Sequence, residues 1–513
     1  MSFFSDSHQG VDAAVIDVGS NSVRLVLYRL DGRAIWTVFN EKVLAGLGRD
    51  LSATGRLAPD GVASALLALS RFAALLEARK PAHVFIAATA AVREAADGPA
   101  FCRRVEAETG LRMRVLSGEE EARYAALGVL AGAPGSEGLV GDLGGASLEL
   151  TRLTDGAPGA GVTLPLGPFS LGGRGPFNAH RARAVADREI GAVAGAFSTD
   201  TLNAVGGAWR NLALLHMRMS GYPLSIIHQY EISRSDALQA ARFIGQQSRG
   251  SLERVDGISR RRLEGLPHAA VVLETLVDRL DIQKVTLSAY GLREGLLLDA
   301  LDHDVRALDP LVEGCAALGV RPALAEALGV ALEAWLSPSF ARLPPLFGGR
   351  DRILLSAACR LAEFGAQLHP DHRADLVFEQ VLRAPIAGMD HAERLFLACA
   401  AFGRHTGAAV MPEPAIVNRL LTSERYVRAR ALGAAIRLGC DLSGRTPELL
   451  AHARLEIKPG AVVLQAEDGW TAMLFGEQTG KRAATLASLL DRELKMRPLA
   501  TKLVKWSQEE AVE

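Results

Sequence analysis

The sequence predicts a layered α/β fold that is built twice in the first 300 residues and followed by a mostly helical region. Short apolar runs typical of strands alternate with segments of helical periodicity between residues 13 and 300. A Gly/Ser-rich hairpin occurs twice in that stretch, and Ala/Leu-rich helical patterns dominate from about residue 301. A chain of 513 residues has room for about three domains of ordinary size.

The repeated hairpin is the strongest sign of duplication. Residues 13–18 and 23–28 are predicted strands that flank the turn GSNS, and residues 139–143 and 148–153 flank the turn GGAS. Three residues of the first copy match three of the second at a constant offset of 125: Asp17 with Asp142, Gly19 with Gly144, and Ser22 with Ser147. Two matching hairpins predict two similar lobes that face each other across a cleft.

The organisation along the chain follows from these patterns. We expect a first α/β domain at residues 1–130, a second at 131–300, a helical domain at 301–445 and a small α/β appendage at 446–513. Within the appendage, residues 455–475 alternate as strands do, and a helix is expected from about residue 481 to 495.

The composition excludes several classes of protein. A formal net charge of -1 gives no overall basic field, so nucleic acid is not an expected partner. The five cysteines are scattered without a CxxC pair, which favours neither a disulfide framework nor a zinc site. No uninterrupted apolar stretch is long enough to suggest a membrane span, so the cytoplasm is the expected location.

The two hairpin turns carry groups suited to phosphate. Successive backbone N–H groups in a Gly/Ser turn form a concavity that binds phosphate oxygens. Asp17, Asp142 and Glu149 lie on the same hairpins, where they would repel an anionic substrate unless a cation lay between them. Mg²⁺ binds in this way, through one or two carboxylates, water and phosphate oxygens. The pattern therefore predicts a metal-bridged phosphate site.

A run of glutamates at residues 117–123 (SGEEEAR) supplies a candidate base. Ser117 and Glu120 have the spacing of a helix capping box, which explains Glu120 structurally. Glu121 points about 100° away, on a helix face that continues with Tyr124 and Gly128 and can approach another backbone closely. The residues alone do not separate a cleft carboxylate from a solvated acid in a first helical turn.

Two arginines could contact the same substrate. Arg93 follows a predicted strand at a helix start, where it could clamp a phosphate or simply lie at the surface. Arg24 alternates with core residues on its strand and so faces the polar side near the first turn. A solvated strand face would explain Arg24 equally well.

Taken together, five motifs resemble those of the exopolyphosphatase / guanosine pentaphosphate phosphatase family. They are IDVGSNS at 16–22, SGEEEAR at 117–123, VGDLGGAS at 140–147, AVGG at 204–207 and GLREG at 291–295. The resemblance implies the duplicated, ribonuclease H-like fold of actin, sugar kinases and heat-shock ATPases, with the site between the lobes. It also implies that the third region is an HD-like helical domain.

The resemblance further implies roles for individual residues. Glu121 occupies the position of the general base that activates water, and Asp17, Asp142 and Glu149 occupy positions that organise Mg²⁺ or another divalent cation. The implied phosphate contacts are Gly19, Ser20, Asn21, Ser22, Arg24, Thr89, Arg93, Gly144, Gly145, Ala146, Ser147, Gly206 and Gly207.

This chain departs from the family pattern at several places. Ala146 replaces a glycine, so φ there must be negative. Ala208 removes a hydroxyl after the Gly206–Gly207 pair, and His268 stands where relatives carry arginine. The helical domain has Ala362 and Glu363 where an HD enzyme carries His-Asp, so no second phosphodiesterase site is expected. His369 and His372 have ligand-like spacing, but the proline between them favours a turn.

The expected activity is hydrolysis of the terminal phosphoanhydride of inorganic polyphosphate, with release of orthophosphate. Guanosine pentaphosphate (pppGpp) is the alternative substrate. A phosphotransferase on the same fold and a non-catalytic sensor of polyphosphate or (p)ppGpp remain alternative classes. A homodimer is also expected.

Overall fold

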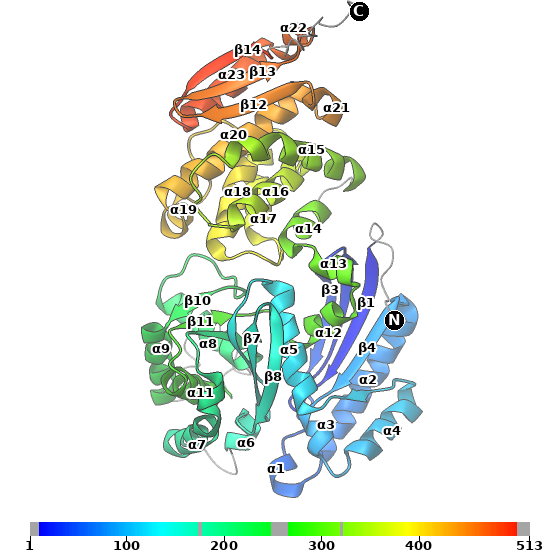
Figure 1. Ribbon diagram of the computed structural model, residues 1–513. Helices are drawn as coiled ribbons and strands as arrows, with labels where there is room; N and C mark the ends of the chain where they lie inside the picture. The colour runs from blue at the N-terminus through cyan, green and yellow to red at the C-terminus, as the bar shows by residue number, and fades with distance from the viewer. Residues whose placement is uncertain (1–9, 173–176, 248–264, 319–321, 500–513) are drawn as a thin grey trace, which may run out of the picture. The chain divides into compact units, whose positions relative to one another are not determined.

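Figure 1 shows the computed structural model, which describes residues 10–172, 177–247, 265–318 and 322–499. The chain forms two compact units. The first comprises Met1–Gly314 and Pro385–Asp390, and the second comprises Cys315–Ala384 and His391–Glu513. The narrower boundaries predicted at residues 130, 300 and 445 stay predictions.

The first lobe of the first unit is a five-stranded sheet with the order β3-β2-β1-β4-β5. β1 pairs antiparallel with β2, β2 antiparallel with β3, and β4 lies parallel between β1 and β5. The strands are β1 (Val11–Val18), β2 (Val23–Asp31), β3 (Ala34–Val43), β4 (His83–Ala88) and β5 (Arg114–Val115). The helices are α1 (Leu51–Thr54), α2 (Pro59–Arg79), α3 (Ala90–Glu94), α4 (Gly98–Thr109) and α5 (Gly118–Gly132).

The second lobe repeats this arrangement. Its sheet has the order β8-β7-β6-β9-β11-β10, and the first five strands have the same relative directions as β3-β2-β1-β4-β5. The strands are β6 (Gly138–Leu143), β7 (Leu148–Thr154), β8 (Ala157–Leu164), β9 (Thr201–Val205), β10 (Glu231–Ser233) and β11 (Lys284–Leu287). The helices are α6 (Pro168–Gly172), α7 (Ala179–Phe197), α8 (Gly207–Met219), α9 (Arg234–Gln246), α11 (Leu266–Arg279) and α12 (Leu292–Ala300), after which α13 (His303–Ala307) and α14 (Pro310–Ala317) follow. The predicted duplication is therefore confirmed at the level of sheet topology.

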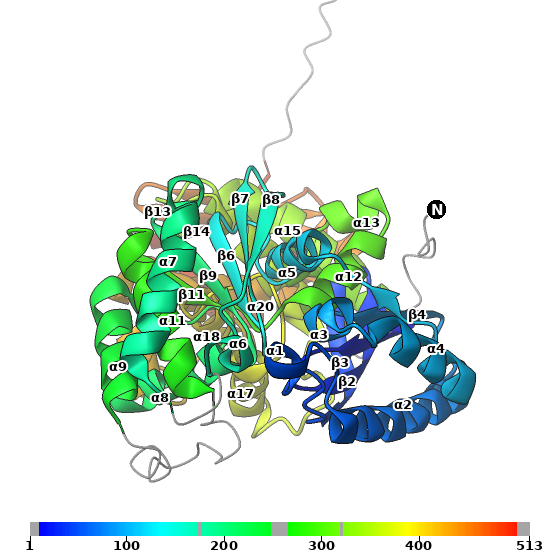
Figure 2. The same ribbon diagram turned by 90° about the horizontal axis from the view of Figure 1, so that it is seen from below.

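Helices α5 and α12 lie between the two sheets (Figure 2). One apolar cluster contains Val15 and Tyr28 of the first sheet, Val140 and Val205 of the second, and Leu297 of α12. Because this cluster draws side chains from both sheets, it holds the two hairpin ends at a fixed separation. Burial of such apolar side chains is the main contribution to the stability of the contact between the two lobes.

The contact between α5 and α12 is backbone against backbone. A Cβ added to Gly128 would overlap the main chain of Gly291, and one added to Gly295 would overlap the backbone oxygen of Tyr124. The predicted close approach of this face of α5 is therefore confirmed. It places the start of α5, which carries Glu121, at a fixed distance from the start of α12.

By length and composition α2 is the one helix in the described part of the chain that could cross a membrane, a possibility that the sequence prediction had not included. Core helices of water-soluble proteins pass the same test. In the structure, Leu69, Phe72 and Leu76 of α2 are buried against the first sheet. Asp60 and Arg71, on other faces of this helix, form ion pairs at the surface. The helix is amphipathic and packs as a sheet-covering helix.

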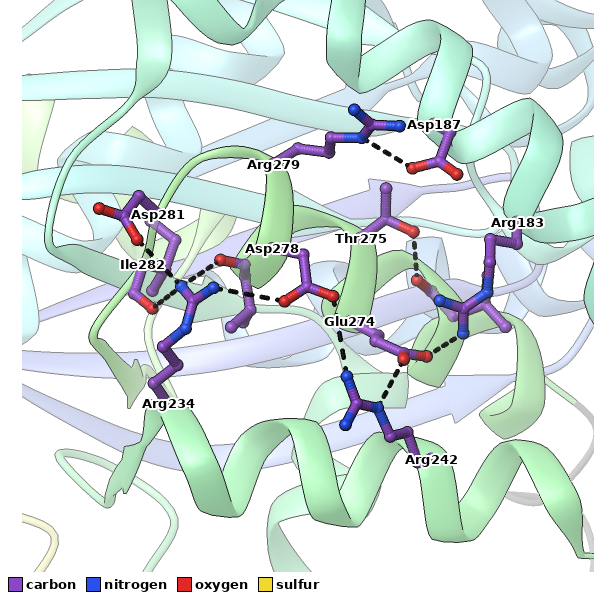
Figure 3. Close-up of polar contacts among 12 residues, drawn as sticks. Arg183, Asp187, Arg234, Arg242, Glu274, Thr275, Asp278, Arg279, Asp281 and Ile282 are labelled. Carbon is purple, nitrogen blue, oxygen red and sulfur yellow. Dashed lines mark hydrogen bonds and ion pairs between the residues drawn. The ribbon is translucent and has the colours of Figure 1, made fainter.

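An ion-pair network ties together three helices of the second lobe (Figure 3). The carboxylate of Glu274 on α11 is buried and is held by Arg183 of α7 and by Arg242 of α9, the latter over 2.9 Å. Arg279 of α11 also pairs with Asp187 of α7 over 3.0 Å. A buried carboxylate with two guanidinium partners is compensated, so we assign this network a structural role.

The second unit is a helical domain followed by a three-stranded sheet. Its elements are α15 (Pro322–Phe340), α16 (Arg350–Arg360), a 3₁₀ turn (Leu361–Glu363), α17 (Arg373–Arg383), α18 (His391–His405), α19 (Pro414–Leu420), α20 (Ser423–Ser443), α21 (Pro447–Leu450), β12 (Ala453–Lys458), β13 (Ala461–Ala466), α22 (Thr471–Leu474), α23 (Glu477–Leu489) and β14 (Glu493–Pro498). β12 pairs antiparallel with β13, and β14 runs parallel to β13.

Two boundaries predicted in this appendage are wrong. The strand pattern expected over 455–475 ends at Ala466, because Gly469 has a positive φ and the chain then turns into α22. The helix expected to reach residue 495 ends at Leu489, and Asp491 in the left-handed region turns the chain into β14. Leu494, which the helical interpretation had included, lies on the same face of that strand as Met496.

Ala362 and Glu363 each contact an arginine. Arg404 Nε donates to the backbone oxygen of Ala362, and Arg445 lies 3.6 Å from the carboxylate of Glu363. His369 and His372 lie in an exposed turn, in which the N–H of His372 donates to the oxygen of His369. The turn interpretation of these histidines is therefore confirmed.

Candidate active site

The two hairpin tips have the same local structure. The N–H of Gly19 donates to the oxygen of Ser22, and the N–H of Gly144 donates to the oxygen of Ser147, both over 2.9 Å. The strand register places Asp17 opposite Arg24 in one hairpin and Asp142 opposite Glu149 in the other. The 125-residue offset seen in the sequence is therefore also an offset in geometry.

The tips face each other directly. A Cβ added to Gly145 would lie 3.3 Å from the Cβ atoms of both Ser20 and Asn21. Within the described ranges, the N–H groups of Ser20, Asn21, Gly145 and Ala146 donate no hydrogen bond to another residue. Four free N–H donors on two facing turns form a cradle suited to an anion.

Both tips are held from behind. The N–H of Gly48 donates to the oxygen of Ser20 over 2.8 Å, and the N–H of Phe169 donates to the oxygen of Gly145 over 2.9 Å. These bonds occupy carbonyl oxygens on the rear of each turn. The orientation of the turns is thus fixed in the protein before any ligand binds.

Glu121 is buried in the first turn of α5. The capping box predicted for Ser117 and Glu120 is present: Ser117 Oγ accepts from the N–H of Glu120, whose carboxylate accepts from the N–H of Ser117. Glu121 turns inward instead, and its Oε2 accepts a hydrogen bond of 2.9 Å from Arg93 Nη1. The structure therefore decides between the two interpretations that the sequence left open, in favour of a carboxylate facing the site.

The electrostatics around Glu121 favour the protonated form. Burial raises the pKa of Glu121 to about 7, Arg93 opposes this rise, and the charges of Asp142 and Asp17 add to it. A carboxylate whose pKa lies near neutral pH can accept a proton without being permanently protonated or a very weak base.

Two further carboxylates lie in the same electrostatic neighbourhood. Burial and the charge of Asp17 raise the pKa of Asp142 to about 6. Burial, Glu121 and Asp142 raise the pKa of Glu149 well above its usual value. Glu149 Oε1 has no hydrogen-bond partner in the described part of the chain. A buried, unpartnered carboxylate oxygen is costly unless a cation or a proton compensates it.

These residues fit a hydrated divalent cation. Among the described residues, no three His, Cys, Asp or Glu side chains are arranged to hold a metal ion on their own. Asp17 is also engaged, since its Oδ2 accepts from Arg293 Nη1 over 2.8 Å. Mg²⁺ requires only one or two carboxylates and keeps several waters, so Glu149, with its unpartnered Oε1, and the neighbouring Asp142 match its donor set.

A cluster of cations borders Asp17. Arg24 and Lys42 lie on neighbouring strands in direct register with Asp17. Burial and the charge of Arg293 lower the pKa of Arg24, and burial of its stem together with Arg24 and Arg293 lowers the pKa of Lys42. We call Arg24, Lys42, Arg210 and Arg293 the basic cluster.

Sequence reasoning found only one member of the basic cluster. Arg24 was predicted at the first tip, but its Nε donates to Asn40 Oδ1 over 2.8 Å on the strand face. Arg293 lies inside the GLREG motif, and Lys42 lies on β3, a strand that the sequence prediction did not include. Their alternation with apolar neighbours was the available signal; their proximity depends on the sheet order and could not be inferred.

The remaining predicted positions surround the tips. Gly206 has φ of 115° and would bring a Cβ to 2.5 Å from the oxygen of Leu143, so glycine is required there. Ala146 has a negative φ, as its methyl group demands. The N–H of Thr89 donates to the oxygen of Val18, which seats the start of α3 behind the first tip. His268 is buried against Phe177, and burial lowers its pKa, which disfavours its charged form.

A cavity of about 210 Å³ opens beside the second tip. Leu51 and Phe169 give it apolar walls, and Ser52, Ser170 and Glu94 give it polar ones. The mixed lining differs from that of the basic cluster and offers no cation to a phosphate chain.

The comparison with known proteins agrees with this geometry. The family model described as Ppx/GppA phosphatase family matches residues 26–304, more than half of the chain. The chain belongs to the Ppx/GppA phosphatase family. A second model, described as the exopolyphosphatase C-terminal domain, matches residues 349–496. Members of this family are hydrolases of phosphoanhydrides, and so is this chain.

Individual relatives cover a little over half of the chain. Exopolyphosphatase 1 of Mycobacterium leprae is 29% identical over 309 residues, which is 56% of this chain and 89% of that protein. An exopolyphosphatase from Cytophaga hutchinsonii has a solved structure with a TM-score of 0.53 at 21% identity, covering 57% of this chain and 99% of that one. A Ppx/GppA member from Aquifex aeolicus gives a TM-score of 0.50 at 24% identity, over 56% and 97% of the two chains. These likenesses confirm the predicted actin-like fold of the Ppx/GppA family.

Proposed function

We propose that this protein is a Mg²⁺-dependent exopolyphosphatase that removes the terminal phosphate of inorganic polyphosphate and releases orthophosphate. The observation that carries the proposal is the buried Glu121, whose pKa is raised to about 7, beside two facing tips with free N–H donors. A base of this kind suits attack by water, whereas a simple phosphate-binding site would not need it.

In the proposed reaction the chain's own groups bind, orient and accept a proton. The N–H groups of Ser20, Asn21, Gly145 and Ala146 hold the oxygens of the terminal phosphoryl group and stabilise the charge that develops on them. Glu121 Oε1 or Oε2 accepts a proton from the attacking water. Arg93 keeps the Glu121 carboxylate oriented through the 2.9 Å hydrogen bond.

Asp142 and Glu149 would hold the divalent cation, with Asp17 at its edge. When bound, Mg²⁺ would neutralise negative charge on the phosphate oxygens and on the leaving group. The raised pKa values of Asp142 and Glu149 and the unpartnered Oε1 of Glu149 support this assignment, because a bound cation would stabilise the charged form of both carboxylates.

The basic cluster favours a long polyanion as substrate. Its four cations interact with one another around Asp17, at the first tip. A single terminal phosphate would not need so many cations, whereas successive phosphates of a chain each carry charge to be matched. The names of the mycobacterial and Cytophaga relatives support the same substrate.

Guanosine pentaphosphate is the second candidate, and the 210 Å³ cavity favours it. Phe169 and Leu51 could stack against a purine ring, and the Glu94 carboxylate could accept hydrogen bonds from guanine N–H groups. A polyphosphate chain would gain nothing from these residues. Phe169→Ala should therefore reduce turnover of guanosine pentaphosphate at least several-fold and leave polyphosphate turnover unchanged.

The decisive assay measures orthophosphate release from polyphosphate and from guanosine pentaphosphate, with Mg²⁺ or with EDTA. Release from polyphosphate that EDTA abolishes supports the proposal and ranks the substrates. Phosphate transfer to an acceptor without release in its absence would favour a phosphotransferase. Binding without release by the folded protein would favour a sensor. The homodimer and the cytoplasmic location stay predictions.

A further inference from the structure

The second unit contains a small cavity whose walls carry three arginines. Its volume is about 40 Å³, and it lies among α18, α20 and α23. Arg430 and Arg437 come from α20, and Arg482 comes from α23. The remaining lining includes the backbone of Gly403 and Gly407 and the hydroxyl-bearing side chains of Thr406 and Thr485; it contains no carboxylate.

The three arginines differ in how they are paired. Arg482 Nε binds Asp441 Oδ2 over 2.7 Å, and Arg430 Nη2 donates to the backbone oxygen of Ala408 over 2.9 Å. The guanidinium of Arg437 forms no hydrogen bond or ion pair with any residue that the structure describes, although it is about half-buried. It is thus the one uncompensated group of the three.

The charges around Arg437 are mostly of its own sign. Burial and the charge of Arg482 lower its pKa, Asp441 opposes this effect, and the buried Arg404 adds to it. Among the described residues, Asp441 is the carboxylate whose charge acts on Arg437, and it is already paired with Arg482. A half-buried guanidinium that bonds to no described residue keeps its N–H donors available to a ligand.

We propose that this cavity binds one phosphate-sized oxyanion, either orthophosphate or the terminal phosphoryl group of a polyphosphate chain. A volume of about 40 Å³ holds roughly three waters, which is close to the size of a tetrahedral oxyanion. A guanidinium group can donate two parallel hydrogen bonds to two oxygens of a phosphate. The N–H donors of Arg437 bond to no described residue and are available for this. All lining residues belong to the second unit, so the site is separate from the one around Glu121.

The chemistry of the walls supports an oxyanion over other small ligands. An apolar ligand would leave Arg437 uncompensated, and a cation would be repelled by three arginines. The contact between α18 and α20, which both line the cavity, is tight, since a Cβ added to Gly433 would overlap the backbone oxygen of Ala400. The cavity is therefore held open by packed helices and does not depend on the ligand to form.

The test counts orthophosphate sites on the full-length protein by equilibrium dialysis with radiolabelled phosphate. Arg437→Ala should lose one site or weaken it at least ten-fold, while Arg437→Lys should weaken it less because the charge remains. Lys481→Ala is the matched control: it removes a cation from the same helix as Arg482, but its partner is Glu477 outside the cavity. It should leave the number of sites unchanged.

Two further readouts keep the result unambiguous. Thermal unfolding without phosphate should be unchanged or raised in Arg437→Ala, because the substitution removes an unpaired charge; this shows that lost binding is not lost folding. Displacement of the labelled phosphate from this site by polyphosphate would assign the terminal phosphoryl group, and no displacement would assign orthophosphate. Equal stoichiometry and affinity in the wild type and in folded Arg437→Ala would overturn the proposal.

Discussion

Arg93 Nη1 donates to both Glu121 Oε2, over 2.9 Å, and the backbone oxygen of Leu116, over 3.0 Å. Leu116 lies just ahead of the helix that carries Glu121, so one guanidinium fixes the carboxylate relative to its own helix start. The same guanidinium holds the pKa of Glu121 below the value that burial alone would give. Arg93 was predicted as a phosphate clamp; the structure shows it as the partner of the proposed base.

Arg93→Ala should shift the pH dependence of phosphate release. Without the arginine the pKa of Glu121 rises further, because burial and Asp142 are then opposed by less positive charge. The acidic limb of the kcat profile should move up by about one pH unit. Arg103→Ala, an exposed arginine on α4, is the control and should leave the profile in place. An unshifted profile in Arg93→Ala would exclude Glu121 as the titrating base.

The stability of the metal-free protein should fall as the pH rises. The folded-state pKa values of Glu121 and Asp142, about 7 and about 6, lie above the ordinary carboxylate values, so the folded protein binds more protons than the unfolded chain. The contribution of these two groups to the free energy of unfolding is therefore greatest below about pH 4. It is lost as the pH rises through 7.

Thermal unfolding at pH 5.5 and 8.0, with and without Mg²⁺, measures this effect. A cation that replaces the protons should stabilise the protein more at pH 8.0 than at pH 5.5. Asp142→Asn should reduce both the pH dependence and the gain from Mg²⁺. Equal stabilisation at the two pH values would contradict a cation at Asp142 and Glu149.

Much of this arrangement could be predicted from the sequence because it is local. The hairpin turns, the capping box at Ser117 and the strand at His83–Ala88 depend on neighbouring residues and are confirmed by the structure. The outcome for Glu121 could not be predicted, since its burial depends on Arg93, 28 residues away, and on how the first turn of α5 packs. The basic cluster was missed for a similar reason: its members meet only through sheet order and through α8 and α12.

Gly295→Ala should disturb the site without touching it. The added methyl group would overlap the backbone of α5, so the helices must separate and the protein should lose about 1–3 kcal/mol of stability. Glu121 and Arg293 would then shift relative to each other, and kcat should fall more than KM changes. Gly191→Ala is the matched control, because Gly191 is an exposed helical glycine with open space around it. That variant should gain about 0.5–1 kcal/mol.

Lys42→Ala should weaken the binding of long-chain polyphosphate. Lys42 adds one charge to the basic cluster but lies away from Glu121, so KM for long-chain polyphosphate should rise several-fold with kcat little changed. The effect should shrink for tripolyphosphate and at high salt, because screening reduces long-range attraction. Lys80→Ala, at the end of α2, should show neither effect. A loss that is independent of chain length would contradict a role for the basic cluster in binding the distal phosphates.

Glu121 is the proposed base in a Mg²⁺-dependent hydrolysis of polyphosphate. The most direct measurement compares orthophosphate release from long-chain polyphosphate by the wild type and by Glu121→Gln, at saturating Mg²⁺ and substrate. We expect a fall in kcat of about 10² or more, with binding of polyphosphate and thermal stability retained. Full activity in Glu121→Gln would contradict this role of Glu121.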